Sequence, residues 1–527
     1  MAKSKKVTST LVGTYRKDCK AWIQDKMLYN YPVGPKTGNC NFETEKIKNV
    51  FLHNRNATLL KFAASFSKNV SVKELKALGY PVSDKPRSDT YALFELKPYE
   101  KIDAKAKDTT NKNKVCSYQF VVSLNDFAAT DEDKSILSHW LHNKGTPFAK
   151  PFEGRTKQLL SQELMDHFTR GSVVCESADQ QTFFPELFDV PFPPPENPAF
   201  TFIDLFAGIG GFRLAMQSLG GKCVFSSEWN EPAKQTYMAN YGELPFGDIT
   251  KPETKACVPT DFDVLCAGFP CQPFSLAGVS KKNSMGRKHG FEDKTQGTLF
   301  FDLKDILSKR RPVAFMLENV KNLLRHDSGL TFEIIRQSLE DELGYVINWK
   351  IVDGSKWVPQ HRERLFIVGY NPDIIKISKD EIIIPTEPEK EYVKPQLKDI
   401  ILKKVEGYTL GPGTWSTLER HKAHHAKEGN GFGYGLHRVP IKKDEVTRTI
   451  SARYHKDGAE ILIEQPGERP RRLTVEEAMQ LQGYPPDKFL FPVSQTQAYR
   501  QIGNSVVWPA IRSCAAEIAK VLKERKK

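Results

Sequence analysis

The chain has 527 residues, which is enough for several domains and a large buried core, so its folding does not depend on disulfide or metal staples. A formal net charge of +13 suits a polyanionic partner such as a nucleic acid, and the nine cysteines show neither a C-x-x-C pair nor zinc-type spacing. No apolar run is long enough for a transmembrane helix and no signal peptide follows Met1, so we expect a cytoplasmic protein with no membrane partner and no metal.

Residues 1–195 form a first segment of mixed pattern with a lysine-rich stretch. Its helix at 71–78 and the following strand are compatible with a DNA-reading winged helix and equally with a generic helix and strand. Residues 189–198 are rich in proline, which disfavours a helix and favours an extended linker, so a new domain is expected after them. The predicted elements of this segment are helices at 42–51, 71–78 and 156–168 and a strand at 91–96.

From residue 201, short apolar runs alternate with stretches that have helical periodicity. This alternation predicts a doubly wound α/β sheet with helices on both faces, and ligands in such a sheet lie at the carboxyl ends of the strands. The predicted strands are 201–206, 222–227, 262–267, 313–317, 345–352 and 365–370, and the predicted helices are 212–219, 232–241, 298–309 and 331–343.

Residues 372–470 break this rhythm, because they are rich in Gly, His, Lys and Arg. This composition indicates an inserted module. After it, Thr474 followed by Glu477 forms a capping-box pattern that opens a helix at 473–482. A basic helix is predicted at 511–527.

A glycine turn is expected between the first predicted strand and helix, in the sequence DLFAGIGGF at 204–212. Glu228 ends the next strand, where nucleotide-binding α/β folds place an acid on the ribose. Arg213 occupies the last position of the G-x-G-x-x-G pattern, which favours an uncharged nucleoside cofactor over a dinucleotide. Trp229 offers a stacking surface for adenine and Asp248 a carboxylate. A structural strand-to-helix turn, a core tryptophan and a loop cap are the alternatives.

Cys271 lies between Pro270 and Pro273, which restrict the backbone on both sides and hold a nucleophilic thiolate at a fixed angle. Glu318 ends another predicted strand and is a candidate proton donor. The sequence QHRER at 360–364 supplies guanidinium groups. A strand-end cap and a solvated charged loop are the alternatives for the last two.

In this order, the motifs resemble those of the DNA (cytosine-5)-methyltransferase family, in wording closest to bacterial restriction-modification enzymes. The resemblance covers about residues 201–527 and leaves the first 195 outside it. It rests on the motifs DLFAGIGGF, Glu228-Trp229, GDI at 247–249, GFPCQPFS at 268–275, QGTxF at 296–300, ENV at 318–320, QHRER, RLTxxExxxLQGYP at 472–485 and YRQIGNSVVxP at 499–509.

The resemblance implies a Rossmann-like methyltransferase core that binds S-adenosylmethionine and no metal. The implied domains are an N-terminal extension of unknown role at 1–195, the catalytic core at 200–371, a smaller target-recognition domain at 372–485, and a segment at 486–527 that completes the core. The implied cofactor-binding residues are Phe206, Gly208, Gly210, Gly211, Glu228, Trp229, Asp248, Ile249, Asn504 and Ser505.

The resemblance also implies a reaction, in which Cys271 adds to C6 of a cytosine flipped out of duplex DNA and C5 then takes the methyl group. Glu318 would bond N3 and the exocyclic amine, and Arg364 would hold the base O2, with Arg362 nearby. Gln272, Ser275 and Thr449 are the implied DNA contacts.

The implied partners are double-stranded DNA and a restriction endonuclease in a bacterial cytoplasm, with the chain acting as a monomer. A tRNA cytosine-5 methyltransferase and a DNA-binding regulator of transcription are the alternative functions. The recognition sequence does not follow from the residues.

Overall fold

The computed structural model describes residues 130–160, 190–270, 299–429 and 433–525, together with residue 73 and the five strands at 10–15, 21–23, 60–71, 90–97 and 117–122. The chain divides into two compact units. One contains residues 1–193 and 235–247, and the other contains residues 194–234 and 248–527.

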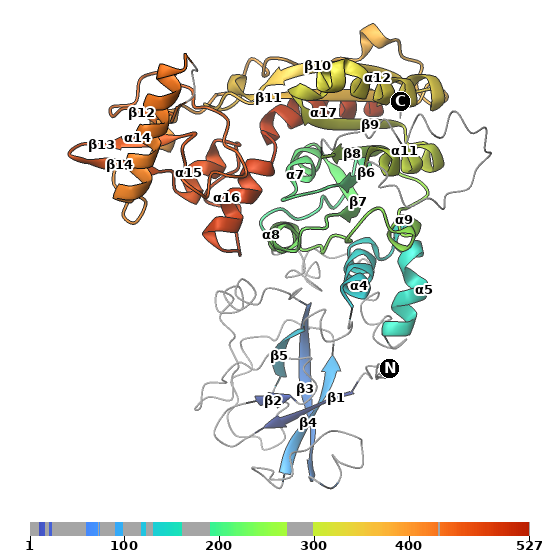
Figure 1. The fold of residues 1–527 in the computed structure, drawn as a ribbon. Coiled ribbons are helices and arrows are strands. Elements are labelled where there is room, and N and C mark those ends of the chain that lie inside the picture. Colours follow the sequence, from blue (N-terminus) through green and yellow to red (C-terminus); the bar gives the residue numbers. More distant parts are fainter. Residues whose placement is uncertain are drawn as a thin grey trace, which may run out of the picture. The chain divides into compact units, whose positions relative to one another are not determined.

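The first unit contains an antiparallel sheet and a pair of helices (Figure 1). The sheet has the strand order β2-β1-β4-β3-β5. Its strands are β1 (Thr10–Tyr15), β2 (Ala21–Ile23), β3 (Leu60–Ser71), β4 (Thr90–Lys97) and β5 (Ser117–Val122), and its helices are α4 (Asp131–Asn143) and α5 (Lys150–Leu159), joined by the 3-10 turn Pro147–Ala149.

The predicted strand at 91–96 is confirmed as β4. The helix predicted at 156–168 overlaps the end of α5, which begins six residues earlier at Lys150, and its residues from 161 lie outside the described residues. The predicted helix at 42–51, and most of that at 71–78, lie outside the described residues.

The second unit is built on a six-stranded sheet with the order β10-β11-β9-β8-β6-β7. All six predicted strands are found, with ends shifted by at most three residues. The four strands β9, β8, β6 and β7 are parallel, whereas β11 runs antiparallel to both of its neighbours. The strands are β6 (Phe200–Leu205), β7 (Gly221–Ser227), β8 (Val264–Gly268), β9 (Ala314–Val320), β10 (Val346–Asp353) and β11 (Glu363–Tyr370).

The fold is therefore the expected Rossmann-like α/β arrangement, with an antiparallel hairpin added at one edge. The hairpin arises because the chain turns back from β10 to β11 within a short connection, which an antiparallel pair allows and a parallel pair does not. This reversal brings the beginning of β11, rather than its end, to the edge where β9 ends.

The predicted helices around the sheet are also found. They are α7 (Gly211–Ser218), α8 (Glu231–Tyr241), α11 (Leu299–Arg310) and α12 (Leu330–Gln337), which continues as a π-helical turn (Ser338–Glu342), and the C-terminal α17 (Trp508–Arg525). Shorter elements are α9 (Pro252–Ala256) and the 3-10 turns Lys321–Leu324, His326–Gly329, Gly354–Lys356 and Lys379–Glu381.

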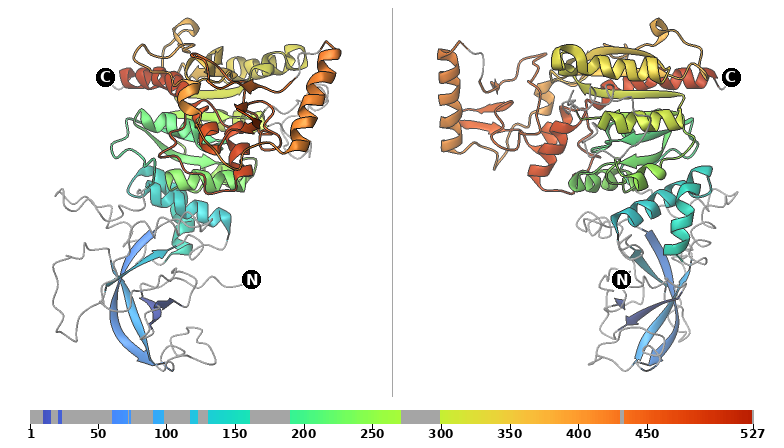
Figure 2. Two further views of the ribbon diagram at one scale, coloured as in Figure 1. Left: turned by 90° about the vertical axis from the view of Figure 1, so that its left-hand side faces the viewer. Right: turned by 45° about the vertical axis from the view of Figure 1, so that its right-hand side comes forward.

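One face of the sheet is covered by α7 and α17, which pack against each other. Alternate residues of the strands, such as Phe202, Cys266 and Met316, join Phe212 of α7 and Ile511 of α17 in a single buried cluster. This alternation is the period of two that a sheet with a covered face requires. Both views of Figure 2 show α17, the dark red helix that ends near the mark C, beside the strands of the sheet.

Residues 372–485 carry their own small sheet, with the order β12-β13-β14, and a long helix. The helix predicted after Thr474 is confirmed with both hydrogen bonds of its capping box. The helix α14 lies along β14 (Figure 1) and was not predicted, because it has no apolar stripe and no buried residue. The elements are α13 (Leu397–Ile400), α14 (Pro412–Lys427), β12 (Leu436–His437), β13 (Leu462–Gln465), β14 (Glu468–Arg472) and α15 (Val475–Gln480), followed by α16 (Gln495–Asn504).

Among the described helices, none is both long enough and apolar enough to cross a membrane.

Candidate active site

The glycine turn after β6 forms the first part of the site. Phe206 has a φ of 54°, which is left-handed and rare for a residue with a side chain, and Gly210 precedes α7 with a φ of 81°. A Cβ atom added to Gly208 would meet no atom within 4 Å, so there is open space beside the turn.

The side chain of Glu228, which follows β7, binds this turn through hydrogen bonds. Its Oε2 accepts a hydrogen bond from the Gly208 amide at 2.8 Å, and its Oε1 accepts one from the Asn230 amide at 2.7 Å. Burial raises the pKa of the Glu228 carboxyl, and the backbone amides of Asn230, Gly208 and Trp229 oppose that shift. Each oxygen keeps a further lone pair for a ligand hydroxyl.

Trp229 follows Glu228, and it is 81% exposed. The alternative of a core tryptophan is therefore wrong. A large aromatic side chain held in the open next to the glycine turn is available for stacking on a planar ring.

Gly211 is the first residue of α7, and it is needed because the chain approaches it closely from far along the sequence. A Cβ atom there would lie 2.5 Å from Val506 Cγ2 and 2.8 Å from the Tyr484 hydroxyl oxygen. Ser505 is buried, and its hydroxyl lies 2.6 Å from that of Tyr484, whereas Asn504 is exposed. Residues 484 and 504–506 thus lie next to the glycine turn.

Asp248 is half-buried after the loop that follows α8, and its Oδ1 accepts a hydrogen bond from the Thr250 amide at 2.9 Å. One of its oxygens therefore caps a turn, which was the alternative for this residue. Its neighbour Ile249 is buried.

Glu318 and Arg364 form an ion pair at the other part of the sheet edge. Arg364 is opposite Val320 and Phe366 is opposite Glu318, so both charged side chains lie on the same face of the antiparallel pair. Arg364 Nε lies 3.0 Å from Glu318 Oε1, and Arg364 Nη1 donates to the Glu363 carbonyl. The sequence predicted both residues, and the reversed direction of β11 brings them together.

The carboxyl group of Glu318 is buried, and burial raises its pKa, although Arg364 and Arg362 oppose this shift. A carboxylic acid that keeps its proton to higher pH can donate a hydrogen bond or a proton to a bound base.

Cys271, Gln272 and Ser275 lie outside the described residues. The residues before Cys271 are described as far as Pro270. They follow β8, whose last residue lies beside Glu318. Gly268, the last residue of β8, pairs with Glu318, and the Asn319 side-chain amide donates to the Phe269 carbonyl at 2.9 Å. Glu318 and Asn319 together therefore fix the start of the segment that carries Cys271.

The two Nη atoms of Arg362 bind backbone carbonyls. Its guanidinium donates to the carbonyl of Ile450 at 3.1 Å, of Gly503 at 3.0 Å and of Ser505 at 2.5 Å. Burial, together with the neighbouring charge of Arg364, lowers the pKa of Arg362 to about 9, so the guanidinium stays charged at neutral pH. Arg362 thus joins three segments that are distant in sequence.

Gln360 binds the same stretch of chain through its side-chain amide, a role that sequence reasoning did not assign. Its Oε1 accepts from the Ile450 amide at 2.7 Å, and its Nε2 donates to the Leu481 carbonyl at 2.7 Å. The only sequence signal was its place in the QHRER motif, since its partner is ninety positions away.

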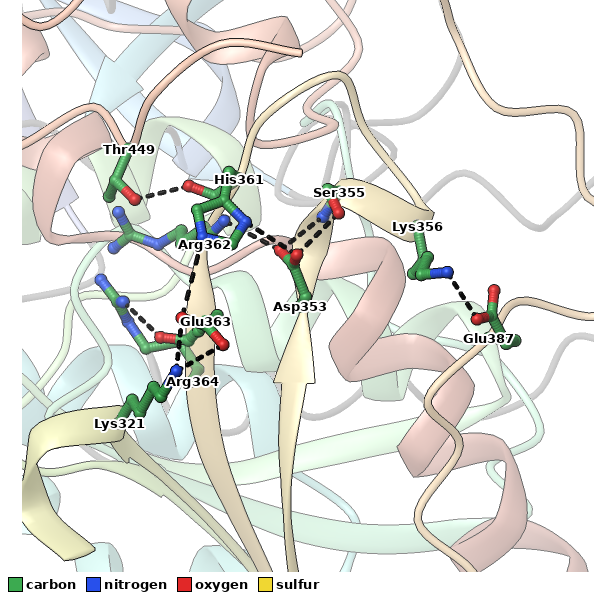
Figure 3. Close-up of polar contacts among 10 residues, drawn as sticks. All are labelled: Lys321, Asp353, Ser355, Lys356, His361, Arg362, Glu363, Arg364, Glu387 and Thr449. Carbon is green, nitrogen blue, oxygen red and sulfur yellow. Dashed lines mark hydrogen bonds and ion pairs between the residues drawn. The ribbon is translucent and has the colours of Figure 1, made fainter. Parts of the chain in front are cut away.

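Thr449 lies beside the β10–β11 connection (Figure 3), at the rim of a hollow. Its hydroxyl donates to the His361 carbonyl at 2.5 Å, and His361 Nδ1 lies 2.8 Å from Asp353 Oδ2. Lys321 reaches Glu363 on the same side. The hollow is lined by Ser355, His361, Val446, Thr447, Arg448 and Thr449.

The sequence model of the C-5 cytosine-specific DNA methylase family matches residues 200–520, which is more than half of the chain and contains every feature described above for the second unit's sheet edge. The chain belongs to this family. It is thus an enzyme of the cytosine-5 DNA methyltransferase class, as the motifs implied.

Similar proteins agree with this assignment. A DNA-cytosine methyltransferase of Escherichia coli K12 is 45% identical over 403 residues, covering 66% of this DNA methylase and 82% of that protein. The Type II methyltransferase M.SsoII of Shigella sonnei is 48% identical over 335 residues, covering 63% and 83%. M.HpaII of Haemophilus parainfluenzae is 42% identical over 358 residues, covering 63% and 93%.

Proposed function

We propose that the chain transfers a methyl group from S-adenosylmethionine to C5 of a cytosine flipped out of duplex DNA, through a covalent bond between Cys271 and C6. The observation that carries this proposal is the Glu318–Arg364 pair, buried at the sheet edge next to the start of the Cys271 segment, in a chain of the DNA methylase family.

The first part of the site fits an adenosine-type cofactor. Open space lies beside Gly208, the Glu228 carboxylate has acceptor capacity for two hydroxyls, and the exposed Trp229 presents a face for a purine. Phe206, Gly210 and Gly211 would shape the turn, and Asp248, Ile249, Asn504 and Ser505 would complete the pocket. The cofactor would supply an electrophilic methyl group.

Cys271 would provide the nucleophile. Addition of its thiolate to C6 breaks the C5–C6 double bond and makes C5 nucleophilic, so that C5 takes the methyl group. Loss of the C5 proton and cleavage of the bond between sulfur and C6 then restore the ring and the free thiolate.

Glu318 and Arg364 would hold the base during these steps. The protonated carboxyl of Glu318 donates to N3, where negative charge builds as Cys271 adds, and its raised pKa favours this protonated form. The guanidinium of Arg364 binds O2 of the base. Both groups are placed before the base arrives, because strand pairing fixes them.

Arg362 would act as a positioning residue and not by touching the base. Its three carbonyl partners and those of Gln360 tie the beginning of β11 to Ile450 and to residues 503–505. Residues that recognise DNA would in this way be held in a fixed place relative to Arg364.

Recognition would come from residues 372–485, with 486–527 completing the catalytic core of 200–371 and residues 1–195 as an extension. Arg448 and Thr449 beside the hollow at His361, together with Gln272 and Ser275, are suited to phosphate and base contacts. Unstacking the target cytosine costs roughly a few kcal/mol, which these contacts must offset.

Two relatives carry the name Type II methyltransferase, which supports a protective partnership with a restriction endonuclease, and we expect the chain to act as a monomer. A tRNA methyltransferase and a non-enzymatic regulator are less well supported, because the matched family is one of DNA methylases and Glu318, Arg362 and Arg364 are all in place.

Purified protein with labelled S-adenosylmethionine should methylate duplex DNA, and Cys271→Ala should abolish transfer because no other thiol can replace it in the same segment. Transfer to tRNA but not to DNA would favour the second function. Full activity of Cys271→Ala would refute the nucleophile. A Cys257→Ala variant is the matched control, since Cys257 lies outside the GFPCQPFS motif, and it should transfer as the unchanged protein does.

A further inference from the structure

The helix α4 presents a buried stripe of polar side chains. Ser135, Ser138, His139 and His142 follow one another at helical spacing, and all four are buried, with exposed fractions between 0% and 6%. A polar stripe in the interior costs free energy unless its groups find partners.

These partners are four successive residues, 242–245, that follow α8. Ser135 Oγ donates to the Pro245 carbonyl at 2.9 Å, and Ser138 Oγ accepts from the Leu244 amide at 2.8 Å. His142 Nε2 donates to the Gly242 carbonyl at 2.8 Å. As the helix advances, its partners step backward along the chain, so the segment runs antiparallel to α4.

The side chains of Glu243 and Phe246 also contact the helices. Glu243 Oε1 lies 3.5 Å from His139 Nε2, with both side chains fully buried. The Phe246 ring packs 4.6 Å from the ring of His139 and 6.0 Å from that of Phe152 in α5. Residues 130–160 and 235–247 belong to the same compact unit, and Figure 1 shows α4 and α5 as a pair.

The segment lies outside the named helices and strands, and α4 supplies hydrogen-bond partners to part of its backbone. Residues 242–246 are all buried, and three of their backbone groups are satisfied by side chains of the helix. Two residues after Phe246 comes Asp248, one of the proposed cofactor contacts, and α8 itself begins three residues after Glu228.

We propose that α4 and α5, from the part of the chain outside the methylase match, are a clamp that holds residues 242–246 and so positions Asp248 and Ile249 for the cofactor. Ser138 and His142 are its positioning residues. The inference rests on the proposed function, because it assumes that Asp248 and Ile249 contact S-adenosylmethionine.

The clamp is tested in the full chain with the double variant Ser138→Ala, His142→Ala. Removing both hydrogen bonds frees the segment, so the Kd for S-adenosylmethionine, measured by titration calorimetry, should rise about tenfold, which corresponds to about 1.4 kcal/mol. The rate of transfer at saturating cofactor and the Kd for DNA should change by less than about threefold. The reason is that the clamp acts on the cofactor pocket and not on the residues that bind DNA.

Thr156→Val is the matched control. Thr156 of α5 is equally buried, but its hydroxyl donates to Phe152 in its own helix and not to residues 242–246. Its cofactor affinity should equal that of the unchanged protein. An equal drop in affinity in the control and the double variant would mean general destabilisation and would overturn the clamp.

Hydrogen exchange gives a readout that does not depend on cofactor. The Leu244 amide and the peptide that spans residues 242–250 should lose protection in the double variant and keep it in Thr156→Val, and His142→Gln, which retains a donor, should restore part of it. Unchanged protection and affinity in the double variant would refute the inference. Failure of the unchanged protein to bind S-adenosylmethionine would instead refute the proposed function.

Discussion

Glu318 is the residue on which the proposed chemistry depends most. It is buried, it faces the guanidinium of Arg364, and burial raises its pKa despite that neighbour. The Glu318 carboxyl is thus easier to protonate than that of an ordinary glutamate.

Glu318→Gln should lower the rate of methyl transfer by about 100-fold or more, because an amide cannot pass a proton to N3. The measurement is single-turnover transfer to duplex DNA. Glu363→Gln is the control, because it changes a nearby carboxylate that binds Lys321. Its rate of methyl transfer should stay within about threefold of that of the unchanged protein, as is usual for a surface substitution. A fully active Glu318→Gln would remove Glu318 from the mechanism.

The same substitution tests the raised pKa. Because the folded state holds the proton more tightly than the unfolded chain, the stabilisation is fully present below the ordinary glutamate pKa of about 4.3 and is lost as pH rises through the raised value. Glu318→Gln does not titrate, so the free energy of unfolding of the unchanged protein should fall relative to that of the variant as pH rises from about 4.3 to the raised pKa, as followed by urea titrations. A difference that does not vary with pH would mean an ordinary pKa.

At the scale of elements, the helix α14 is unusual because it has no buried residue and is basic in its last turn. Lys422 lies over the ring of Tyr434 at 4.4 Å, and Trp415 packs against the same ring at 4.8 Å. A helix with no buried residue and a basic last turn presents its charged side chains to solvent, where an anionic partner can bind them. In the proposed function those contacts are DNA phosphates.

The double variant Lys422→Ala, Lys427→Ala should weaken DNA binding at low salt and reduce the slope of log K against log salt by about 0.9 for each phosphate that the variant no longer neutralises. Fluorescence anisotropy over a salt series measures both. Lys520→Ala, Lys523→Ala in α17 removes the same charge from another helix and should leave the slope unchanged. Equal effects in the two variants would mean that only net charge matters, and α14 would have no special role.

At the scale of the whole molecule, the proposed division of labour puts sequence recognition in residues 372–485. Exchanging this module with that of a relative, while keeping Ile450 and its hydrogen bonds to Gln360 and Arg362, should move the methylated site without abolishing transfer. Bisulfite sequencing of host DNA identifies the site. An unchanged site would assign recognition to residues 1–195 instead.

Much of this molecule follows from local patterns in its sequence. The six strands, the glycine turn and the capped helix at Thr474 are each encoded by residues close together in the sequence. Strand alternation and turn chemistry act at that range, so they are readable without a structure.

Features that depend on distant partners were not predictable in the same way. The helix α14 lacks the apolar periodicity that signals a helix, and the buried serines and histidines of α4 have partners about a hundred positions away. Arg362 was expected near the base, and its carbonyl partners at residues 450, 503 and 505 could not be read from the sequence. Tertiary packing, rather than local preference, decides such roles.

The antiparallel hairpin β10–β11 also limits how this chain can change over time. Side chains alternate between the two faces of a strand, so a shift of one residue in the register of β11 against β9 would turn Arg364 away from Glu318 while leaving every residue of both strands intact. Insertions and deletions within β11 are therefore excluded, whereas the connection at 354–362 is constrained by the buried hydrogen bonds of Gln360 and Arg362. Comparing natural variants of the chain should show a β11 of constant length with Gln360 and Arg362 retained before it.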